Sequence, residues 1–158
     1  MEDTLAFVTA GGQDELLRPL TDVRAESAVP FGRIFRTIDF ALSSCVNSGL
    51  RRIHVLTRYK SHSLSSHLKR GWNLLSARLD QFIDAVPAQL QLGSSWYQGT
   101  ADAIRQNASL IENKRPRLVL ILSGDHVYEM DDRPAALLAP RRHRQRRDAP
   151  HRKLRDAS

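Results

Sequence analysis

Two neighbouring glycines, Gly11 and Gly12, directly follow a short apolar run at residues 5–9. A buried parallel strand delivers a backbone turn in this way, and the amide groups of such a turn can bind phosphate. A glycine pair is also common in ordinary tight turns, so its position after a strand carries the interpretation. The spacing indicates a candidate phosphate-binding loop.

A second candidate binding element begins near Gly99 and Thr100. The sequence predicts a helix from Thr100, acting as N-cap, to about Ile111, with Asp102 in its first turn. We expect Gly99 and Thr100 to lie at the helix N-terminus, where backbone amide groups can face a ligand.

The elements that would position these residues alternate along the chain. Short β-rich runs at residues 5–9, 53–57 and 118–122 are separated by helical patterns. Residues 38–46 and 61–70 have the apolar spacing of packing helices, and the first stops at Asn47-Ser48-Gly49. This alternation predicts an α/β, Rossmann-like fold with a mostly parallel sheet flanked by helices.

The chain has 158 residues, enough for one domain with a core. Its net charge of +7 arises entirely beyond residue 132, because residues 1–132 contain 15 basic and 15 acidic residues and residues 133–158 contain 9 and 2. We expect a folded part over 1–132 and a basic, disordered tail over 133–158. Basic clusters also bind nucleic acid by counterion release, but the tail lacks interleaved aromatic residues, so solvated disorder is the better account.

The remaining composition favours a cytoplasmic protein. Cys45 is the single cysteine and is expected to be a buried thiol, since one thiol cannot form an internal disulfide. No run reaches the roughly 18 apolar residues that span a bilayer. The start, Met1-Glu2-Asp3, is acidic where a signal peptide would be basic, so we expect neither export nor a membrane partner.

A series of motifs extends the Gly11-Gly12 segment through the chain to about residue 132. They are Ala10-Gly11-Gly12, Pro19-Leu20-Thr21, Ala28-Val29-Pro30-Phe31-Gly32, Phe35-Arg36-Thr37-Ile38-Asp39-Phe40, Arg70-Gly71-Trp72, Pro87-Ala88-Gln89, Trp96-Tyr97-Gln98-Gly99-Thr100-Ala101-Asp102-Ala103 and Ser123-Gly124-Asp125-His126-Val127-Tyr128. With these motifs in this order the chain resembles the sugar-1-phosphate nucleotidyltransferases, and among them the glucose-1-phosphate adenylyltransferases.

The resemblance implies a nucleotide-diphospho-sugar transferase type of fold and a specific reaction. Members of the family join ATP and glucose 1-phosphate into ADP-glucose and pyrophosphate for glycogen synthesis, with a divalent metal such as Mg²⁺. Their catalytic domain is longer than this whole chain and precedes a β-helix domain. Residues 1–132 would therefore be a partial, truncated nucleotidyltransferase domain.

The resemblance also implies roles for individual residues. Asp125 matches the family's metal-binding catalytic aspartate and follows the 118–122 strand, where ligands of parallel sheets bind. Gln89 and Gly99 match positions that contact the adenine. With Gly11, Gly12 and Thr100, they form the predicted nucleotide-binding set. A turn-forming aspartate, a buried glutamine and a turn glycine are the structural alternatives.

The chain departs from the family pattern within the phosphate loop. Asp14, Glu15 and Leu16 replace the family's glycine, small hydroxyl residue and phosphate-binding arginine, and Glu26 replaces a lysine. Carboxylates beside a triphosphate would repel it, so we expect weak activity or none.

Two functions remain open. The chain is a weakly active or inactive adenylyltransferase-like protein that binds ATP and glucose 1-phosphate. The alternative is a non-catalytic nucleotide-binding or assembly module that forms homo- or hetero-oligomers with an intact paralogue.

Overall fold

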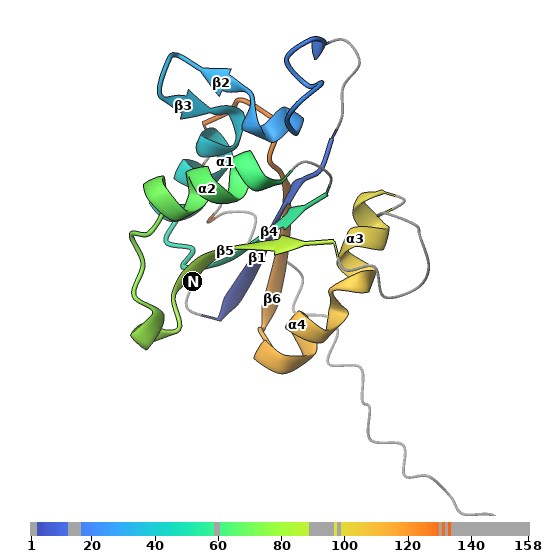
Figure 1. Ribbon diagram of the computed structural model, residues 1–158. Coiled ribbons are helices and arrows are strands. Elements are labelled where there is room, and N and C mark those ends of the chain that lie inside the picture. Colours follow the sequence, from blue (N-terminus) through green and yellow to red (C-terminus); the bar gives the residue numbers. More distant parts are fainter. Residues whose placement is uncertain are drawn as a thin grey trace, which may run out of the picture.

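A four-stranded parallel sheet organises the molecule (Figure 1). The computed structural model describes residues 3–12, 17–58, 61–88, 97, 99–129, 131 and 133. Strands β1 (Thr4–Ala10), β4 (Arg52–Thr57), β5 (Phe82–Pro87) and β6 (Leu118–Ser123) are arranged in the order β5-β4-β1-β6. The predicted α/β fold with a parallel sheet is confirmed.

Helices cover both faces of the sheet and bury two apolar cores. Helices α1 (Thr37–Asn47) and α2 (His62–Gly71) pack on one face, with Leu42, Cys45 and Leu68 among the buried residues. Helices α3 (Thr100–Gln106) and α4 (Ala108–Lys114) pack on the other face, around Phe7 and Leu56. Alternate residues of the strands point to opposite faces, so each face supplies one core. The predicted burial of Cys45 is confirmed.

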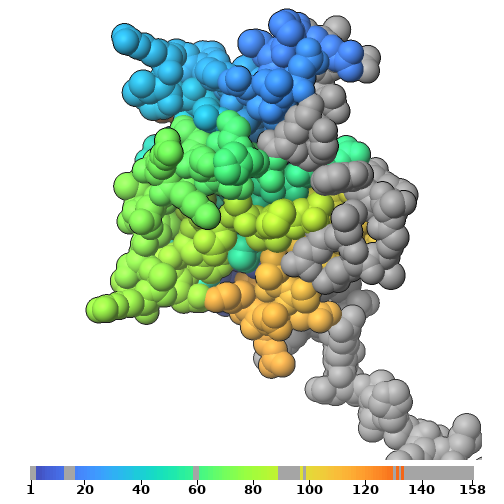
Figure 2. Space-filling view, in the orientation of Figure 1, coloured from blue at the N-terminus to red at the C-terminus, as the bar shows by residue number. Residues whose placement is uncertain are grey.

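Short elements connect β1 to α1. They are the 3₁₀ helix η2 (Glu26–Ala28) and an antiparallel hairpin of β2 (Pro30–Phe31) and β3 (Phe35–Arg36). The hairpin (blue) projects above α2 (green) in Figure 2. A further 3₁₀ helix, η3 (Ala77–Leu79), precedes β5.

The carboxylate of Asp39 joins α1 to α2. Its Oδ2 accepts a hydrogen bond from the Arg36 backbone N–H at 2.8 Å, which caps α1. Its Oδ1 lies 2.7 Å from His67 Nε2 and accepts a hydrogen bond from Trp72 Nε1 at 2.7 Å. The buried carboxylate thus has three hydrogen-bonding partners, which are the N-cap residue of α1, a residue within α2 and the C-cap residue of α2.

The helix after Gly99 differs from its prediction. Gly99, not Thr100, is the N-cap residue, and α3 ends at Gln106 instead of continuing to Ile111. The buried amide of Asn107 donates hydrogen bonds to the Ala103 carbonyl and to Tyr97 Oη. Asparagine competes with the helical backbone in this way, which accounts for the break before α4.

Strand β5 was not indicated by the sequence pattern. It contains Asp84, ends at Pro87 and lies at one edge of the sheet, where proline is tolerated. Among the described residues, no helix is long and apolar enough to cross a membrane.

Candidate active site

The carboxyl ends of β4, β1 and β6 lie side by side and border a cavity of about 190 Å³. The chain crosses from one side of β1 to the other between β5 and β6, and ligands of open parallel sheets bind at such a crossover. The lining residues are Thr9, Gly11, Gly12, Leu56, Arg58, Tyr97, Gly99, Thr100, Ala103, Ser123 and Asp125.

Five of the residues predicted as binding or catalytic line this cavity together. Gly11 and Gly12 follow β1, Asp125 follows β6, and Gly99 and Thr100 begin α3. Gly99 has φ 145°, a conformation that side chains rarely adopt. Gln89 and the loop residues Asp14, Glu15 and Leu16 lie outside the described residues.

The carboxylate of Asp125 is held at the end of β6 with one oxygen toward the glycine loop. Ser123 Oγ donates a short hydrogen bond to Oδ1, and His126 Nε2 lies 3.7 Å from the same oxygen. The backbone N–H of Gly124 donates to the Thr9 carbonyl at 2.9 Å, which ties this turn to β1. Oδ2 lies 3.6 Å from the point where a Cβ on Gly12 would stand.

A second carboxylate, that of Glu26, lies beside Gly12. Its Oε2 is 2.7 Å from the same Cβ point, and its backbone N–H donates to the Gly12 carbonyl at 3.3 Å. The hydroxyl of Thr37 donates to the Glu26 carbonyl at 3.1 Å and fixes this segment to α1. The loop glycine is thus flanked by two acidic side chains.

Besides the apolar Leu56 and Ala103, four lining residues with polar groups, Thr9, Arg58, Tyr97 and Ser123, were not predicted as site residues. Thr9, Arg58 and Ser123 lie at or next to the carboxyl end of a strand, the same position from which Gly11 was predicted to bind phosphate. Applying that rule to all three strands would have found them. Tyr97 is buried in the core and is brought to the cavity by its hydrogen bond with Asn107.

The donor set suits a magnesium ion better than zinc. In the parts of the chain that the structure describes, no three His, Cys, Asp or Glu residues gather as a metal cluster. Asp125 offers a carboxylate, and Thr9 and Ser123 offer hydroxyl oxygens, to the same cavity. Mg²⁺ prefers oxygen ligands and is commonly held by one or two carboxylates together with substrate phosphates.

A larger cavity of about 790 Å³ lies along β5 and α2. Leu68, Trp72, Phe82 and Asp84 are among its lining residues. None of the predicted site residues that the structure describes borders it, so its size does not make it the better candidate.

Comparison with known proteins identifies the family to which the chain is similar. Residues 5–149 match the family model described as nucleotidyl transferase. Glucose-1-phosphate adenylyltransferase 2 of Vibrio parahaemolyticus is 53% identical over 131 residues, which are 83% of this chain and 32% of the relative. The glucose-1-phosphate adenylyltransferase of Nitrosospira multiformis is 55% identical over 129 residues, 82% of this chain and 30% of the relative. The glucose-1-phosphate adenylyltransferase of Methylococcus capsulatus is 54% identical over 128 residues, which are 81% of this chain and 30% of the relative.

The chain spans about a third of the length of these curated relatives. The match nevertheless covers most of this chain, including all but the first residue of β1, all of β6 and every described residue of the cavity. By its sequence and by the parallel sheet that carries the cavity, the chain belongs to the nucleotidyl transferase family.

Proposed function

We propose that this chain binds ATP with Mg²⁺ in the cavity at the carboxyl ends of β1, β4 and β6, as a nucleotide-binding domain of the glucose-1-phosphate adenylyltransferase type. The observation that carries the proposal is the convergence of Gly11, Gly12, Gly99, Thr100 and Asp125 on one cavity from three separate parts of the chain. A structural role for each residue would not require that convergence.

Each residue has a role that its chemistry supports. The backbone amides of Gly11 and Gly12 bind phosphate oxygens. Gly99 lets the base approach the backbone, and Thr100 supplies a hydroxyl at the start of α3. Gln89 contacts the adenine through its amide, as the resemblance implies.

Asp125 would hold the metal ion. Ser123 orients its carboxylate by donating to Oδ1, so that Oδ2 faces the loop at Gly12. When bound, Mg²⁺ supplies positive charge that offsets the charge of the phosphate oxygens. The remaining work of the chain is to position the nucleotide in line with a second substrate.

In the proposed reaction, an oxygen of the glucose 1-phosphate group attacks the α-phosphorus of ATP. A new phosphorus–oxygen bond forms, the α–β bridging bond breaks, and pyrophosphate leaves with the bonding electrons. We propose that this chain performs the reaction weakly or not at all, because Glu26 places a carboxylate beside Gly12 where the triphosphate must lie.

Calorimetric titration of ATP in the presence of Mg²⁺ tests the proposal. We expect weak binding by the natural chain and at least about tenfold tighter binding by Glu26→Lys. The matched control Glu112→Lys makes the same charge change on an exposed residue of α4, outside the cavity, and should leave affinity unchanged.

A full loop repair, adding Asp14→Gly, Glu15→Ser and Leu16→Arg to Glu26→Lys, should bind ATP more tightly still. An assay of released pyrophosphate measures the formation of ADP-glucose from ATP and glucose 1-phosphate. Absence of ATP binding by both the natural and the repaired chain, with circular dichroism of a folded protein, would refute the proposed site.

One observation favours the second candidate, an assembly module that pairs with an intact paralogue. Strand β6 lies at the edge of the described sheet, and Val119 and Ile121 on it are 39% and 48% exposed. Apolar strand edges pair readily with other chains. Light scattering after mixing with a full-length paralogue should detect a complex that Ile121→Lys abolishes and that Leu79→Lys, on another exposed apolar residue, preserves.

A further inference from the structure

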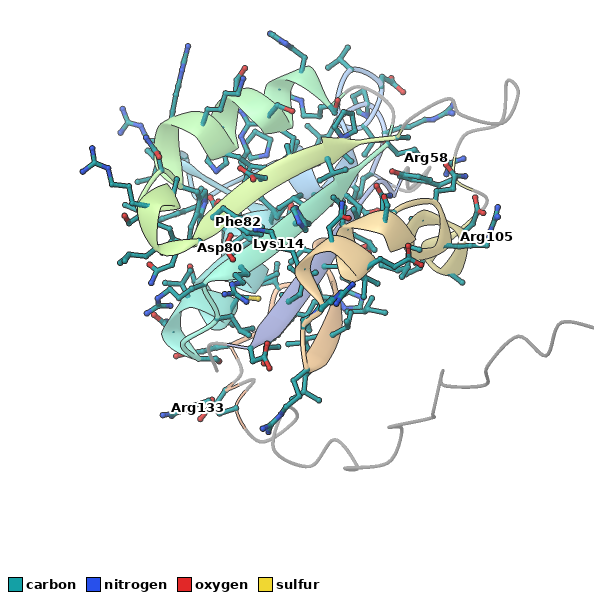
Figure 3. All side chains as sticks on the ribbon, turned by 90° about the horizontal axis from the view of Figure 1, so that it is seen from below. Arg58, Asp80, Phe82, Arg105, Lys114 and Arg133 are labelled. Atoms are coloured by element: carbon teal, nitrogen blue, oxygen red, sulfur yellow. The ribbon has the colours of Figure 1, made fainter. Side chains whose placement is uncertain are left out.

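Arg58 is the basic residue among the described lining of the nucleotide cavity. It directly follows β4, as Gly11 follows β1 and Gly124 follows β6. The carboxyl ends of these neighbouring parallel strands meet at one edge of the sheet. Figure 3 shows Arg58 on the side of the molecule near α3, away from the cluster of Asp80, Phe82 and Lys114.

The side chain of Arg58 packs against the first glycine of the loop. A Cβ on Gly11 would stand 2.7 Å from Arg58 Cβ, 3.5 Å from Cδ and 3.6 Å from Cγ. Real Cβ atoms do not approach so closely, so the absence of a side chain at Gly11 lets the aliphatic part of Arg58 lie there. The aliphatic part of the Arg58 side chain is therefore positioned by Gly11 as well as by the end of β4.

Among the residues that the structure describes, no carboxylate pairs with Arg58. By contrast, Arg105 on α3 pairs with Asp102 at 2.7 Å and Arg52 with Asp80 at 3.1 Å. An arginine held at a cavity wall without such a partner remains available to an anionic ligand. A guanidinium binds phosphate through two parallel N–H donors, which gives geometry as well as charge.

We propose that Arg58 binds the phosphates of the nucleotide and supplies, from the end of β4, positive charge that residues 11–17 of the loop after β1 lack. This inference rests on the proposed function, because it requires ATP in the same cavity. According to this proposal, the positive charge for the phosphates comes from the end of β4 and not from the loop after β1. Glu15, Leu16 and Glu26 place no cation in the loop, and Arg58 reaches the loop from the neighbouring strand.

Titration of ATP with Mg²⁺ into the full chain and its variants tests the role of Arg58. We expect Arg58→Gln to weaken ATP binding by roughly tenfold to a hundredfold, the loss typical of a charge-assisted hydrogen bond. Arg58→Lys should lose less, because it keeps the charge but not the paired donors. Arg105→Gln, a change of the same kind on α3 outside the cavity lining, should bind ATP as the natural chain does.

Two further readouts separate phosphate binding from a structural role. The affinity of adenosine, which carries no phosphate, should be the same in the natural chain and in Arg58→Gln. The dependence of ATP affinity on salt concentration should become shallower in Arg58→Gln, since one cation is removed from the contact with phosphate. A parallel loss of adenosine binding would overturn the inference.

The outcomes distinguish this inference from the proposed function. Equal ATP affinity of the natural chain and Arg58→Gln would overturn the role of Arg58 and leave the nucleotide site standing. Absence of ATP binding by the folded natural chain would overturn both.

Discussion

Two aspartates of this chain, Asp39 and Asp125, occupy contrasting environments. Asp39 lies between α1 and α2 with a side chain 9% exposed, and its two oxygens have hydrogen-bonding partners in the Arg36 backbone, His67 and Trp72. Asp125 follows β6 with a side chain 27% exposed; among the described residues its Oδ1 contacts Ser123 and His126, and its Oδ2 lies toward Gly12. The same functional group is enclosed by protein donors in one place and borders a cavity in the other.

The comparison explains how a carboxylate can be assigned to stability or to binding. A buried carboxylate with a full set of donors contributes to stability, because removing it leaves every buried donor without an acceptor. A carboxylate with one oxygen toward a cavity contributes to ligand affinity, because water satisfies it when the ligand is absent. Sequence motifs contain both residues and do not separate these cases.

The largest expected effect is on stability, from Asp39→Ala. The substitution leaves the Trp72 and His67 side chains and the Arg36 N–H without their acceptor, at a cost of about 3 kcal/mol in the free energy of unfolding. Urea denaturation followed by circular dichroism measures it. A loss below about 1 kcal/mol would mean that water replaces the carboxylate and that the two aspartates differ less than their contacts indicate.

Asp125→Asn should show the opposite behaviour. We expect a loss of about tenfold or more in ATP affinity in the presence of Mg²⁺, and little difference from the natural chain when EDTA removes the metal. The free energy of unfolding should change by less than about 0.5 kcal/mol. A loss of stability as large as that of Asp39→Ala would contradict the assignment of Asp125 to binding.

His54 provides a third case, a polar side chain buried among aromatic rings. Its ring lies between Phe7 and Phe82, with centroids 5.6 and 4.7 Å away, and neither ring nitrogen has a hydrogen-bond partner among the described residues. Burial lowers the pKa of His54 below its ordinary value of 6.5, with Lys114 acting in the same direction and Asp84 against it.

The lowered pKa predicts a dependence of stability on pH. The folded state keeps His54 neutral, so the unfolded state binds more protons as the pH falls below 6.5, and stability declines toward the folded-state pKa. The contribution of this one group stays below about 1.4 kcal/mol per pH unit. Urea denaturation at pH 7.5 and 5.5 should show a smaller difference for His54→Leu than for the natural chain, and equal differences would refute the assignment.

The smallest expected effect comes from Ser123→Ala. It removes the donor that orients Asp125, and we expect a threefold to tenfold loss of ATP affinity in the presence of Mg²⁺ with a stability change of a few tenths of a kcal/mol. Calorimetry and urea denaturation measure the two quantities. Ser63→Ala is a suitable control, because the Ser63 hydroxyl accepts a hydrogen bond from Arg36 and lies on α2, on the face of the sheet opposite α3.

Much of the fold could be predicted because it depends on local patterns. The apolar runs at residues 5–9, 53–57 and 118–122 correspond to β1, β4 and β6 within one or two residues, and residues 38–46 and 61–70 correspond to α1 and α2. Strand β5 could not be predicted, because Asp84 and Pro87 interrupt the apolar pattern that marks the other strands. The break at Asn107 could not be predicted either, because it depends on the hydrogen bonds that the buried Asn107 amide donates to the Tyr97 hydroxyl and the Ala103 carbonyl.

The sequence by itself determined the family, the order of strands and helices along the chain, and the candidates Gly11, Gly12, Gly99, Thr100 and Asp125, because each follows from a local run or motif. Only the tertiary structure decided that β6 pairs with β1, which brings Asp125 beside Gly12, and that Arg58 lies on Gly11. The physical reason is that strand order in a sheet depends on packing between distant segments, and one sequence pattern is compatible with several such orders.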